Sequence, residues 1–284
     1  MASRIKKSLM FPLAALIILG LTSVSGCGGG GDGGSEVALT GTITESGSTS
    51  VKPLAEALAA AFMDKYPKVK IEIGGGGSGK GISDCAAGIS DIGAVSRPPK
   101  IGEADLIYYP IARDAVAIVV NEDNSVTELT TEQVAKIYTG DITKWSEVGW
   151  ANGGDITVYC REAGSGTLDC FEHGVLREIG KKEADITPNA ERYDSNAGMQ
   201  IAVQADASAI GFVSLGYVEG LKVLKLDGIE CTIETCKSGD YPVLRRLAFV
   251  SKACPDEPTK AFINFCRSEE GQAIAAEKGY VPLT

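Results

Sequence analysis

The stretch ITVYCREAGSGTLDCF, residues 156–171, contains a strand, a turn and a helix start in immediate succession. Residues 156–160 form a short apolar run typical of a buried strand, and the small residues at 163–167 interrupt it. Apolar side chains then return at helical spacing, at Leu168, Phe171, Val175 and Ile179. This order predicts a strand, a glycine-rich turn and a helix, with Arg161 at the end of the strand.

The same alternation continues along the chain. Strand-like segments cover residues 37–44, 69–73, 91–95, 115–120 and 245–251, and residues 209–218 read as a strand and turn. Helix-like segments cover residues 54–66, 82–89, 129–145 with a closing turn, 195–206 and 255–278. This pattern predicts a mainly parallel α/β fold. A chain of 284 residues with 44% hydrophobic content is long enough for one large or two modest domains.

The first 26 residues predict a secretory signal rather than part of this fold. A basic segment precedes an apolar stretch at residues 9–21, which is too short for a permanent membrane span. Residues 24–27, Val-Ser-Gly-Cys, are similar to a lipoprotein signal in which Cys27 becomes the lipidated N-terminus. An ordinary cleavage site with a chance cysteine is the alternative. The glycine-rich run at 27–37 predicts a flexible tether.

The charge of the chain argues against several classes of partner. Loss of the signal removes three positive charges, at Arg4, Lys6 and Lys7, and no negative ones, so the formal net charge goes from −10 to −13. A domain this acidic is a poor candidate for binding nucleic acid. Its overall field does not attract anions either, so any anion site must be built locally from helix N-termini and a few placed cations.

Seven cysteines follow Cys27, and this odd number leaves at least one without a partner. They are Cys85, Cys160, Cys170, Cys231, Cys236, Cys254 and Cys266. Export permits disulfides, so Cys231 and Cys236 could close a small loop and Cys254 and Cys266 could clip a helix start. Sequence alone does not fix the pairing. Because His173 is the single histidine and no C-x-x-C pair is present, we expect no zinc or other metal site.

Three strand-to-helix turns combine glycine with serine or threonine: SGSTS at 46–50, GGGSGKG at 75–81 and AGSGT at 163–167. Glycine allows a close backbone approach, a helix N-terminus offers free N–H donors, and hydroxyl groups add further donors. One such turn is usually an ordinary helix cap. Three of them, one beside Arg161, favour an oxyanion held by helix ends and a guanidinium fork. The alternative is that Arg161 forms an ordinary ion pair at the surface.

The run GGGGSGKG at 74–81 fits two nucleotide-binding patterns only in part. The phosphate-loop pattern requires serine or threonine where this chain has Gly81, and the dinucleotide pattern lacks its later acidic residue. We therefore expect no cofactor. No G-x-S-x-G motif is present, and His173 has no evident nucleophile partner. A glycosidase with paired carboxylates stays open, although no spacing singles out such a pair.

Several segments, taken in order, resemble the phosphate-binding lipoproteins of ABC phosphate importers. They are SGSTSVKPLAEALAAAF (46–62), GGGGSGKGI (74–82), SDIGAVSR (90–97), LTTEQVAKIYTGDITKW (129–145), REAGSGTLDCF (161–171) and ASAIGFVSLGYV (207–218). The resemblance covers residues 38–284 and implies a two-lobed periplasmic-binding-protein fold of type II. In that fold mainly parallel sheets are flanked by helices, and the ligand cleft lies between the lobes. The resemblance implies a binding protein, not an enzyme, that delivers inorganic phosphate to ABC permease subunits.

Carried over to matching positions, the resemblance implies a phosphate site built from both lobes. Its residues are Ser48, Thr49, Ser50, Ser78, Ser96, Arg161, Ser165, Gly166 and Thr167. Ser96 departs from the best-known branch, in which an aspartate accepts a hydrogen bond from protonated phosphate and helps to exclude sulfate. Sulfate, molybdate and tungstate are therefore alternative ligands, and a secreted phosphatase is the alternative class. Asp91 is a second candidate acceptor for the phosphate proton. The alternative is that Asp91 simply stabilises a turn.

The resemblance also predicts the domain organisation. The first lobe would combine residues 38–115 with 250–284, and the second would hold residues 116–249. The strands at 115–121 and 247–251 would cross between the lobes. We expect a monomer that is exported and anchored through Cys27 to the outer face of the cell membrane.

Overall fold

The computed structural model describes residues 39–103 and 105–283. The folded part is the unit Ala38–Thr284. The predicted signal sequence, the lipidated Cys27 and the tether up to residue 37 lie outside the described residues. Within the described ranges, the helices are all too short or too polar to cross a bilayer.

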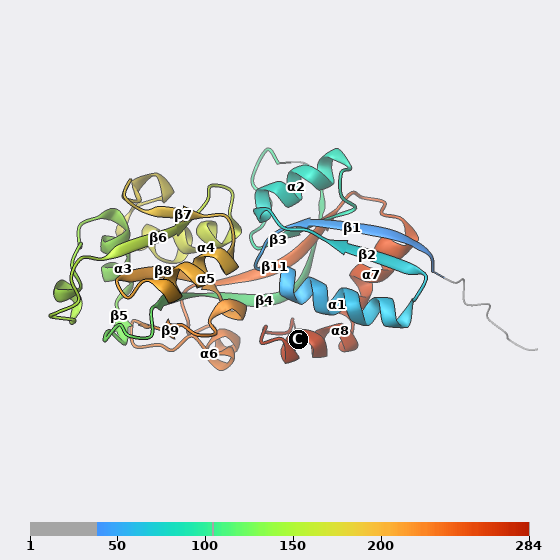
Figure 1. The fold of residues 1–284 in the computed structure, drawn as a ribbon. Helices are drawn as coiled ribbons and strands as arrows, with labels where there is room; N and C mark the ends of the chain where they lie inside the picture. The colour runs from blue at the N-terminus through green and yellow to red at the C-terminus, as the bar shows by residue number, and fades with distance from the viewer. Residues whose placement is uncertain (1–38, 104, 284) are drawn as a thin grey trace, which may run out of the picture. The chain divides into compact units, whose positions relative to one another are not determined.

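The first lobe starts with strands and helices that alternate along the chain (Figure 1). They are β1 (Gly41–Gly47), α1 (Lys52–Lys65), β2 (Val69–Ile73), α2 (Gly77–Ala87) and β3 (Ile92–Val95). α1 has a proline in its first turn and buries one face through Leu54, Leu58 and Phe62. β1 lies between β2 and β3 and is parallel to both. The carboxyl ends of all three strands, and the turns that follow them, therefore meet at one edge.

Strands and helices also alternate along the second lobe. Its main elements are α3 (Thr131–Thr139), β6 (Thr157–Arg161), α4 (Gly166–Gly174), β7 (Glu191–Tyr193), α5 (Asn196–Ala205) and β8 (Ala209–Ser214). β6 pairs in parallel with β7 and with β8. α3 begins with a capping box between Thr130 and Gln133, which satisfies free N–H groups at the helix start. β6 and α4 confirm the strand, turn and helix start predicted for residues 156–171.

Two antiparallel strands, β4 (Ile107–Val120) and β11 (Leu244–Ser251), join the lobes and are called the link strands below. They lie at the centre of a nine-stranded sheet with the order β2-β1-β3-β11-β4-β8-β6-β7, and β9 pairs with β4. Pairing is parallel between the outer strands of each lobe and antiparallel around the link strands. In Figure 1 the link strands run side by side between the two groups of elements.

Each lobe has its own hydrophobic core, and the link strands contribute to both. In β4, Ile111 and Ala112 belong to the core of the first lobe, whereas residues 115–120 belong to the core of the second. In β11, Phe249 belongs to the first core, and Leu244 packs against the second. The boundary between the two cores therefore crosses β4 between residues 112 and 115.

The C-terminal segment returns to the first lobe as α7 (Glu257–Arg267) and α8 (Glu269–Glu277). Phe262 of α7 packs edge-on against Phe62 of α1, with ring centroids 5.3 Å apart. The remaining short elements are β5 (Glu128–Leu129), β9 (Lys222–Val223), β10 (Lys225–Leu226), α6 (Ile233–Ser238) and 3-10 turns at Trp145–Val148, Leu176–Ile179, Glu183–Asp185 and Leu215–Tyr217.

Several elements differ in extent from the sequence prediction, and two of these differences have a clear local cause. β4 begins well before residue 115, and the strand pattern was broken there by Pro110, which has no N–H group for a ladder hydrogen bond. The partner strand accommodates Pro110 with a register shift between Leu247 and Ala248. The helix expected to reach Ile179 ends at Gly174, because Val175 leaves the helical backbone with φ −127°.

The seven cysteines within the described residues are free thiols. Cys254 precedes α7 and Cys266 lies near its end. Roughly 15 Å of helix therefore separates them, which is beyond disulfide reach. The expected clip between these two cysteines is not formed. Cys231 and Cys236 differ, because both are buried and the Cys236 thiol raises the pKa of Cys231.

Candidate functional site

The N-termini of α1, α2, α4 and α5 meet where the two lobes touch. All nine residues predicted for the site lie at or near these helix starts, or at the end of the neighbouring strands β3 and β6, and all are buried. They are Ser48, Thr49, Ser50, Ser78, Ser96, Arg161, Ser165, Gly166 and Thr167. Strand ends of both lobes thus bring residues from four separate sequence segments, 48–50, 78, 96 and 161–167, into one place.

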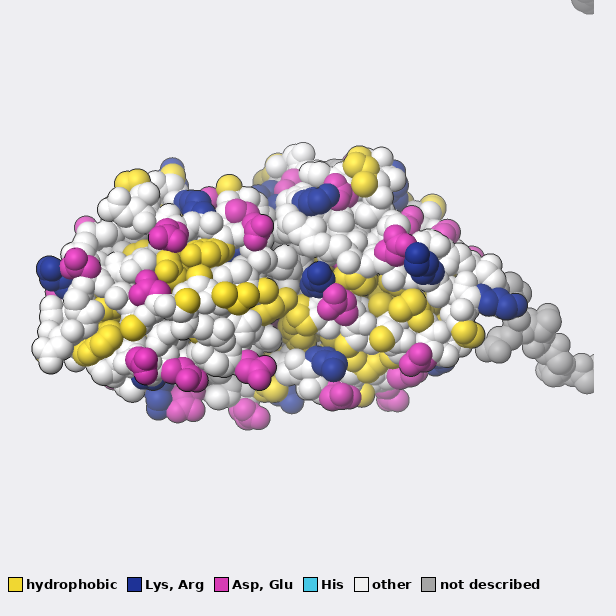
Figure 2. All heavy atoms as spheres, viewed as in Figure 1, with side chains coloured by type: hydrophobic (Ala, Val, Ile, Leu, Met, Phe, Trp, Pro, Cys, Tyr) yellow, Lys and Arg dark blue, Asp and Glu magenta, His cyan; other side chains and the backbone are white. Residues whose placement is uncertain are grey.

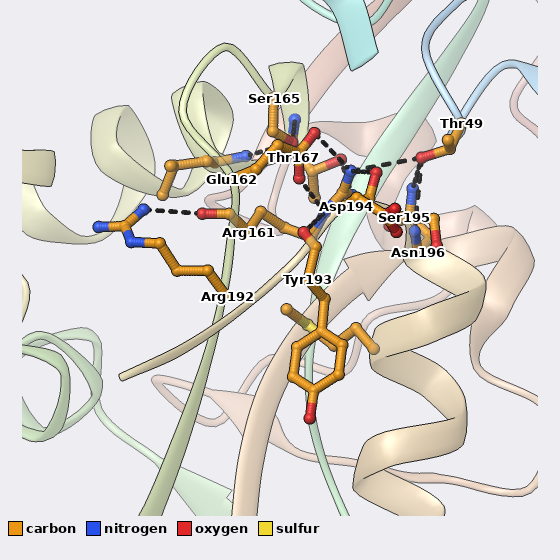
Figure 3. A network of polar contacts seen from close by, with 12 residues as sticks. Thr49, Arg161, Glu162, Ser165, Thr167, Arg192, Tyr193, Asp194, Ser195 and Asn196 are labelled. Atoms are coloured by element: carbon orange, nitrogen blue, oxygen red, sulfur yellow. Dashed lines mark hydrogen bonds and ion pairs between the residues drawn. The ribbon is translucent and has the colours of Figure 1, made fainter. Parts of the chain in front are cut away.

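Hydroxyl groups of the first lobe bond directly to the second lobe (Figure 3). The Ser50 Oγ lies 2.9 Å from the Thr167 Oγ1. The Nδ2 of Asn196 donates to the Thr49 Oγ1 at 3.1 Å and to the Ser50 Oγ at 2.9 Å. The Tyr217 hydroxyl donates to the Thr49 carbonyl at 2.9 Å. The predicted anion-binding hydroxyls therefore hold the two lobes together.

Arg161 is 1% exposed and fixed on every side. Its guanidinium donates to the Glu162 carboxylate at 2.9 and 3.1 Å and to the carbonyl groups of residues 193–194 at 3.1 and 3.2 Å. It also reaches the hydroxyl oxygens of Thr49 and Thr167, each at 3.4 Å. Burial lowers the pKa of Arg161 from its ordinary value, and the Glu162 carboxylate opposes that shift. Figure 3 shows this guanidinium among its partners.

Three serines form a second group of hydroxyls on the first lobe. The Ser48 Oγ donates to the Ser96 Oγ at 2.9 Å, and the Ser96 backbone N–H donates to the Ser78 Oγ at 3.0 Å. Gly166 of α4 approaches this group closely. A Cβ added there would lie 2.2 Å from the Ser96 Oγ and 2.5 Å from the Ser78 Oγ, so a larger residue at this position would push the lobes apart. Ser165 precedes Gly166 and caps α4.

Sequence reasoning missed three buried residues of this network, Asp114, Asn196 and Arg245. Arg245 donates to the Thr167 Oγ1 at 2.9 Å and to the Ser50 Oγ at 2.8 Å. Arg245 also forms an ion pair with Asp114, with a nitrogen–oxygen distance of 2.7 Å. The sheet thus places a second arginine against the same hydroxyls that Arg161 approaches.

Two weak signals in the sequence could have indicated these residues. Arg245 stands in a strand that is otherwise largely apolar, and Asp114 directly precedes the apolar run at 115–120. A charged residue inside a buried strand requires a partner. Asn196 carries a weaker signal, because it lies at the start of the helix predicted for residues 195–206, where a polar residue is ordinary.

The alternative acceptor Asp91 lies elsewhere. Its Oδ2 accepts hydrogen bonds from the backbone N–H and the hydroxyl of Thr44, both at 2.8 Å. This pairing supports the turn role for Asp91.

A cavity of about 530 Å³ borders the network at Thr49 and is lined by residues of both lobes. Its charged side chains are Lys52, Glu56, Glu162 and Asp194. Figure 2 shows acidic and basic side chains interspersed over the visible face, and the basic side chains do not gather into a patch there. The cations of the network are buried, so an anion would be attracted locally rather than by the surface field.

A second cavity, of about 580 Å³, borders the network at Ser96 and Arg245. Its wall carries an ion pair between the lobes, in which Lys100 and Asp169 lie 2.8 Å apart. His173 also lines it, and its Nδ1 lies 2.7 Å from the Asp169 carbonyl. Across residues 39–103 and 105–283, no group of three or more histidines, cysteines or acidic residues could hold a metal ion.

Residues 34–270 match the PBP superfamily domain. The chain is 31% identical over 294 residues to the phosphate-binding protein PstS of Staphylococcus epidermidis, covering 95% of this chain and 88% of the relative. A solved structure named as a phosphate ABC transporter substrate-binding protein with bound phosphate, from Clostridium perfringens, is 40% identical with a TM-score of 0.82. The match covers 86% of this chain and 100% of that one.

A second solved structure, an ABC-type phosphate transport receptor from Vibrio cholerae, is 36% identical with a TM-score of 0.69 and covers 84% of this chain and 99% of that one. These matches confirm the two-lobed α/β periplasmic-binding-protein fold that the sequence predicted. The chain belongs to the PBP superfamily and, within it, to the family of phosphate-binding proteins that includes PstS.

Proposed function

We propose that this protein is an extracytoplasmic solute-binding protein that captures inorganic phosphate between its lobes and delivers it to an ABC permease. The observation that carries the proposal is the buried network in which Arg161 meets hydroxyl groups of both lobes at the starts of four helices. N–H, O–H and guanidinium donors together complement a tetrahedral oxyanion. Family membership favours phosphate over sulfate, molybdate or tungstate.

Phosphate would enter the network by separating Ser50 from Thr167, so that both hydroxyls donate to its oxygens. The proposed ligands are the nine residues predicted from the sequence, with Arg161 as the charged one. The lobes, proposed as residues 38–115 with 250–284 and residues 116–249, would close over the anion by bending the link strands. The ion pair between Lys100 and Asp169 would then act as a further contact between the closed lobes.

Binding rather than catalysis fits the hydrogen bonds of these hydroxyls. A secreted phosphatase would need a nucleophile activated by a base or a metal. The hydroxyl oxygens of Ser50 and Thr167 instead accept hydrogen bonds from arginine and amide donors. These donors withdraw electron density from the oxygens and make them weaker nucleophiles.

We further infer that the chain is exported, that residues 1–26 are removed and that Cys27 carries the lipid anchor. Residues 27–37 would tether a monomeric domain to the outer face of the cell membrane. In that compartment Cys231 and Cys236 are our candidate pair for a disulfide, because they are close in sequence, both are buried, and the Cys236 thiol raises the pKa of Cys231. A Cys27→Ser variant should appear in the soluble fraction, and a membrane-bound variant would contradict the anchor.

Calorimetric titration of the mature protein tests the central proposal. Phosphate should bind reversibly at one site per chain, more tightly than sulfate, arsenate or molybdate, and a phosphomonoester such as p-nitrophenyl phosphate should not be hydrolysed. Tighter binding of another oxyanion would replace the ligand but keep the class of protein. Turnover of the ester would instead favour the phosphatase.

A further inference from the structure

Arg245 and Asp114 are neighbours across the two link strands. They are direct partners in the antiparallel register of β11 and β4, and both are buried. The Asp114 Oδ2 accepts from the Nε of Arg245 at 2.9 Å and from the Ser214 hydroxyl at 2.8 Å, while Oδ1 accepts from the Leu215 backbone N–H at 3.2 Å. The carboxylate is therefore satisfied on both oxygens, and it fixes the direction of the arginine.

The other edge of the same guanidinium faces the proposed anion site. Nη1 donates to the Thr167 Oγ1 at 2.9 Å, and Nη2 donates to the Ser50 Oγ at 2.8 Å. Ser50 belongs to the first lobe, Thr167 to the second, and Arg245 to the strand that links them. One side chain thus holds a hydroxyl from each lobe.

The donors around these hydroxyls fill their lone pairs. A hydroxyl oxygen has two lone pairs and one proton, whereas guanidinium and amide nitrogens only donate. The Ser50 Oγ accepts from Arg245 and from Asn196, at 2.8 and 2.9 Å. The Thr167 Oγ1 accepts from Arg245 and from Arg161, at 2.9 and 3.4 Å. Each oxygen has its proton left to offer, and at 2.9 Å one of the two hydroxyls donates that proton to the other until an anion separates them.

We propose that Arg245, held by Asp114, is a positioning residue that makes the Ser50 and Thr167 hydroxyls one-way donors, which donate a hydrogen bond to the anion but cannot accept one from it. Such donors favour oxyanion oxygens that carry no proton. This inference rests on the proposed function and adds to it the protonation state that this side of the site selects. Ser96 differs, because neither an arginine nor an amide donates to its Oγ: Ser48 donates to it at 2.9 Å, and its contact with the Ser78 hydroxyl at 3.3 Å can run in either direction. A proton on phosphate would therefore point toward Ser96.

The test compares phosphate with sulfate, which has no proton to donate at neutral pH. In Arg245→Met the lone pairs of Ser50 and Thr167 become free, so these hydroxyls can accept a phosphate proton as well as donate. Hydroxyls that can also accept donate less firmly to sulfate, and because hydrogen bonds to charged groups are strong, sulfate affinity should fall at least about tenfold. Phosphate affinity should fall less, since a phosphate proton can bond to the freed lone pairs. The phosphate-to-sulfate preference should therefore rise. Arg246→Met, an exposed neighbour on β11, is the matched control and should change neither affinity.

The outcomes separate the two proposals. A wild-type protein that binds neither anion overturns the proposed function and this inference with it. A wild-type protein that binds phosphate but no sulfate overturns the one-way donors alone. Equal losses of both affinities in Arg245→Met also overturn them, because a purely structural role would weaken both anions alike.

A second variant covers a folding failure of Arg245→Met, which circular dichroism would reveal. Arg245→Lys keeps the charge beside Asp114, but its compact ammonium lacks the planar fork that sets one nitrogen against each hydroxyl while Nε faces Asp114. The same rise in phosphate preference, smaller in size, is expected. Wild-type values for both anions in Arg245→Lys would overturn the inference.

Discussion

Ser50 and Thr167 lie 117 positions apart in the chain, yet their hydroxyl oxygens are 2.9 Å apart. Ser50 stands before α1 of the first lobe, and Thr167 lies in the first turn of α4 of the second. Neither lobe alone assembles the network to which both belong. Closure of the lobes and assembly of the donors are therefore one event, so a change that keeps the lobes apart should weaken binding even where it removes no donor.

Gly166→Ala tests that coupling. Its added Cβ would lie 2.2 Å from the Ser96 Oγ, so the lobes should no longer close fully. Overpacking of this kind costs about 1–3 kcal/mol, which corresponds to roughly tenfold or more in phosphate affinity by calorimetry. Gly79→Ala is the control, because its Cβ would lie 3.6 Å from the nearest atom, an ordinary contact. Equal affinities of the two variants would show that closure does not need this approach.

Arg161→Ala should remove the charged fork of the site. Affinity for phosphate should fall at least about tenfold, since each hydrogen bond to a charged group contributes roughly 1.5–3 kcal/mol. The variant should also melt at a somewhat lower temperature, because the carbonyl groups of residues 193–194 lose their donor. Arg177→Ala, on an exposed arginine paired with Glu172, is the control. An unchanged dissociation constant would place Arg161 outside the site.

The sequence predicted the local parts of the site better than its long-range parts. The turns before α1, α2 and α4 combine glycine with hydroxyl residues within a few positions, so their role can be inferred without the fold. Arg245 and Asp114 lie 131 residues apart and meet only through the antiparallel register of the link strands. Each strand also carries a second charge, Arg113 in β4 and Arg246 in β11, so the charges alone do not reveal that register.

Helix ends were also harder to predict than helix starts. Thr130 and Ser195 carry side chains that cap α3 and α5, which is a local signal. Apolar spacing continues past Gly174 to Ile179, and nothing in that spacing distinguishes one long helix from a helix followed by a 3-10 turn.

Glu45 should make stability depend on pH. The side chain is 4% exposed, and both carboxylate oxygens lack a hydrogen-bond partner. Burial raises the pKa of Glu45 well above its ordinary value, Lys52 opposes that shift and Glu56 adds to it. The folded state therefore holds this proton more tightly than the unfolded chain, and stability falls as pH rises from 4.5 toward the raised pKa.

Glu45→Gln removes this titration. The variant should match the wild type near pH 4 and melt at least about 2 °C higher at pH 8, because 1 kcal/mol corresponds to roughly 2–4 °C for a domain of this size. Melting curves across that range measure the difference, with the exposed Glu277→Gln as control. A wild-type advantage that grows with pH would mean that the Glu45 carboxylate is stabilised by a partner.

Ser96→Asp tests how the site distinguishes phosphate from sulfate. Ser96 lies beside Ser48 and Ser78 and against the start of α4, so a carboxylate there would face the anion. Phosphate keeps a proton at neutral pH and can donate it to that carboxylate. Sulfate cannot, and a like charge placed against it costs several kcal/mol. We expect the native protein to reject sulfate weakly and Ser96→Asp to raise the phosphate-to-sulfate preference at least about tenfold.

Competition binding at fixed ionic strength and neutral pH gives this preference for the native protein, Ser96→Asp and Ser96→Asn. The asparagine variant has the shape of aspartate without its charge, so it separates repulsion from crowding beside Gly166. If Ser96→Asn raises the preference as much as Ser96→Asp, the effect is steric. If the native protein already excludes sulfate and Ser96→Asp only weakens phosphate, another group accepts the phosphate proton. Asp91 would not be that group, because its carboxylate is bonded to Thr44.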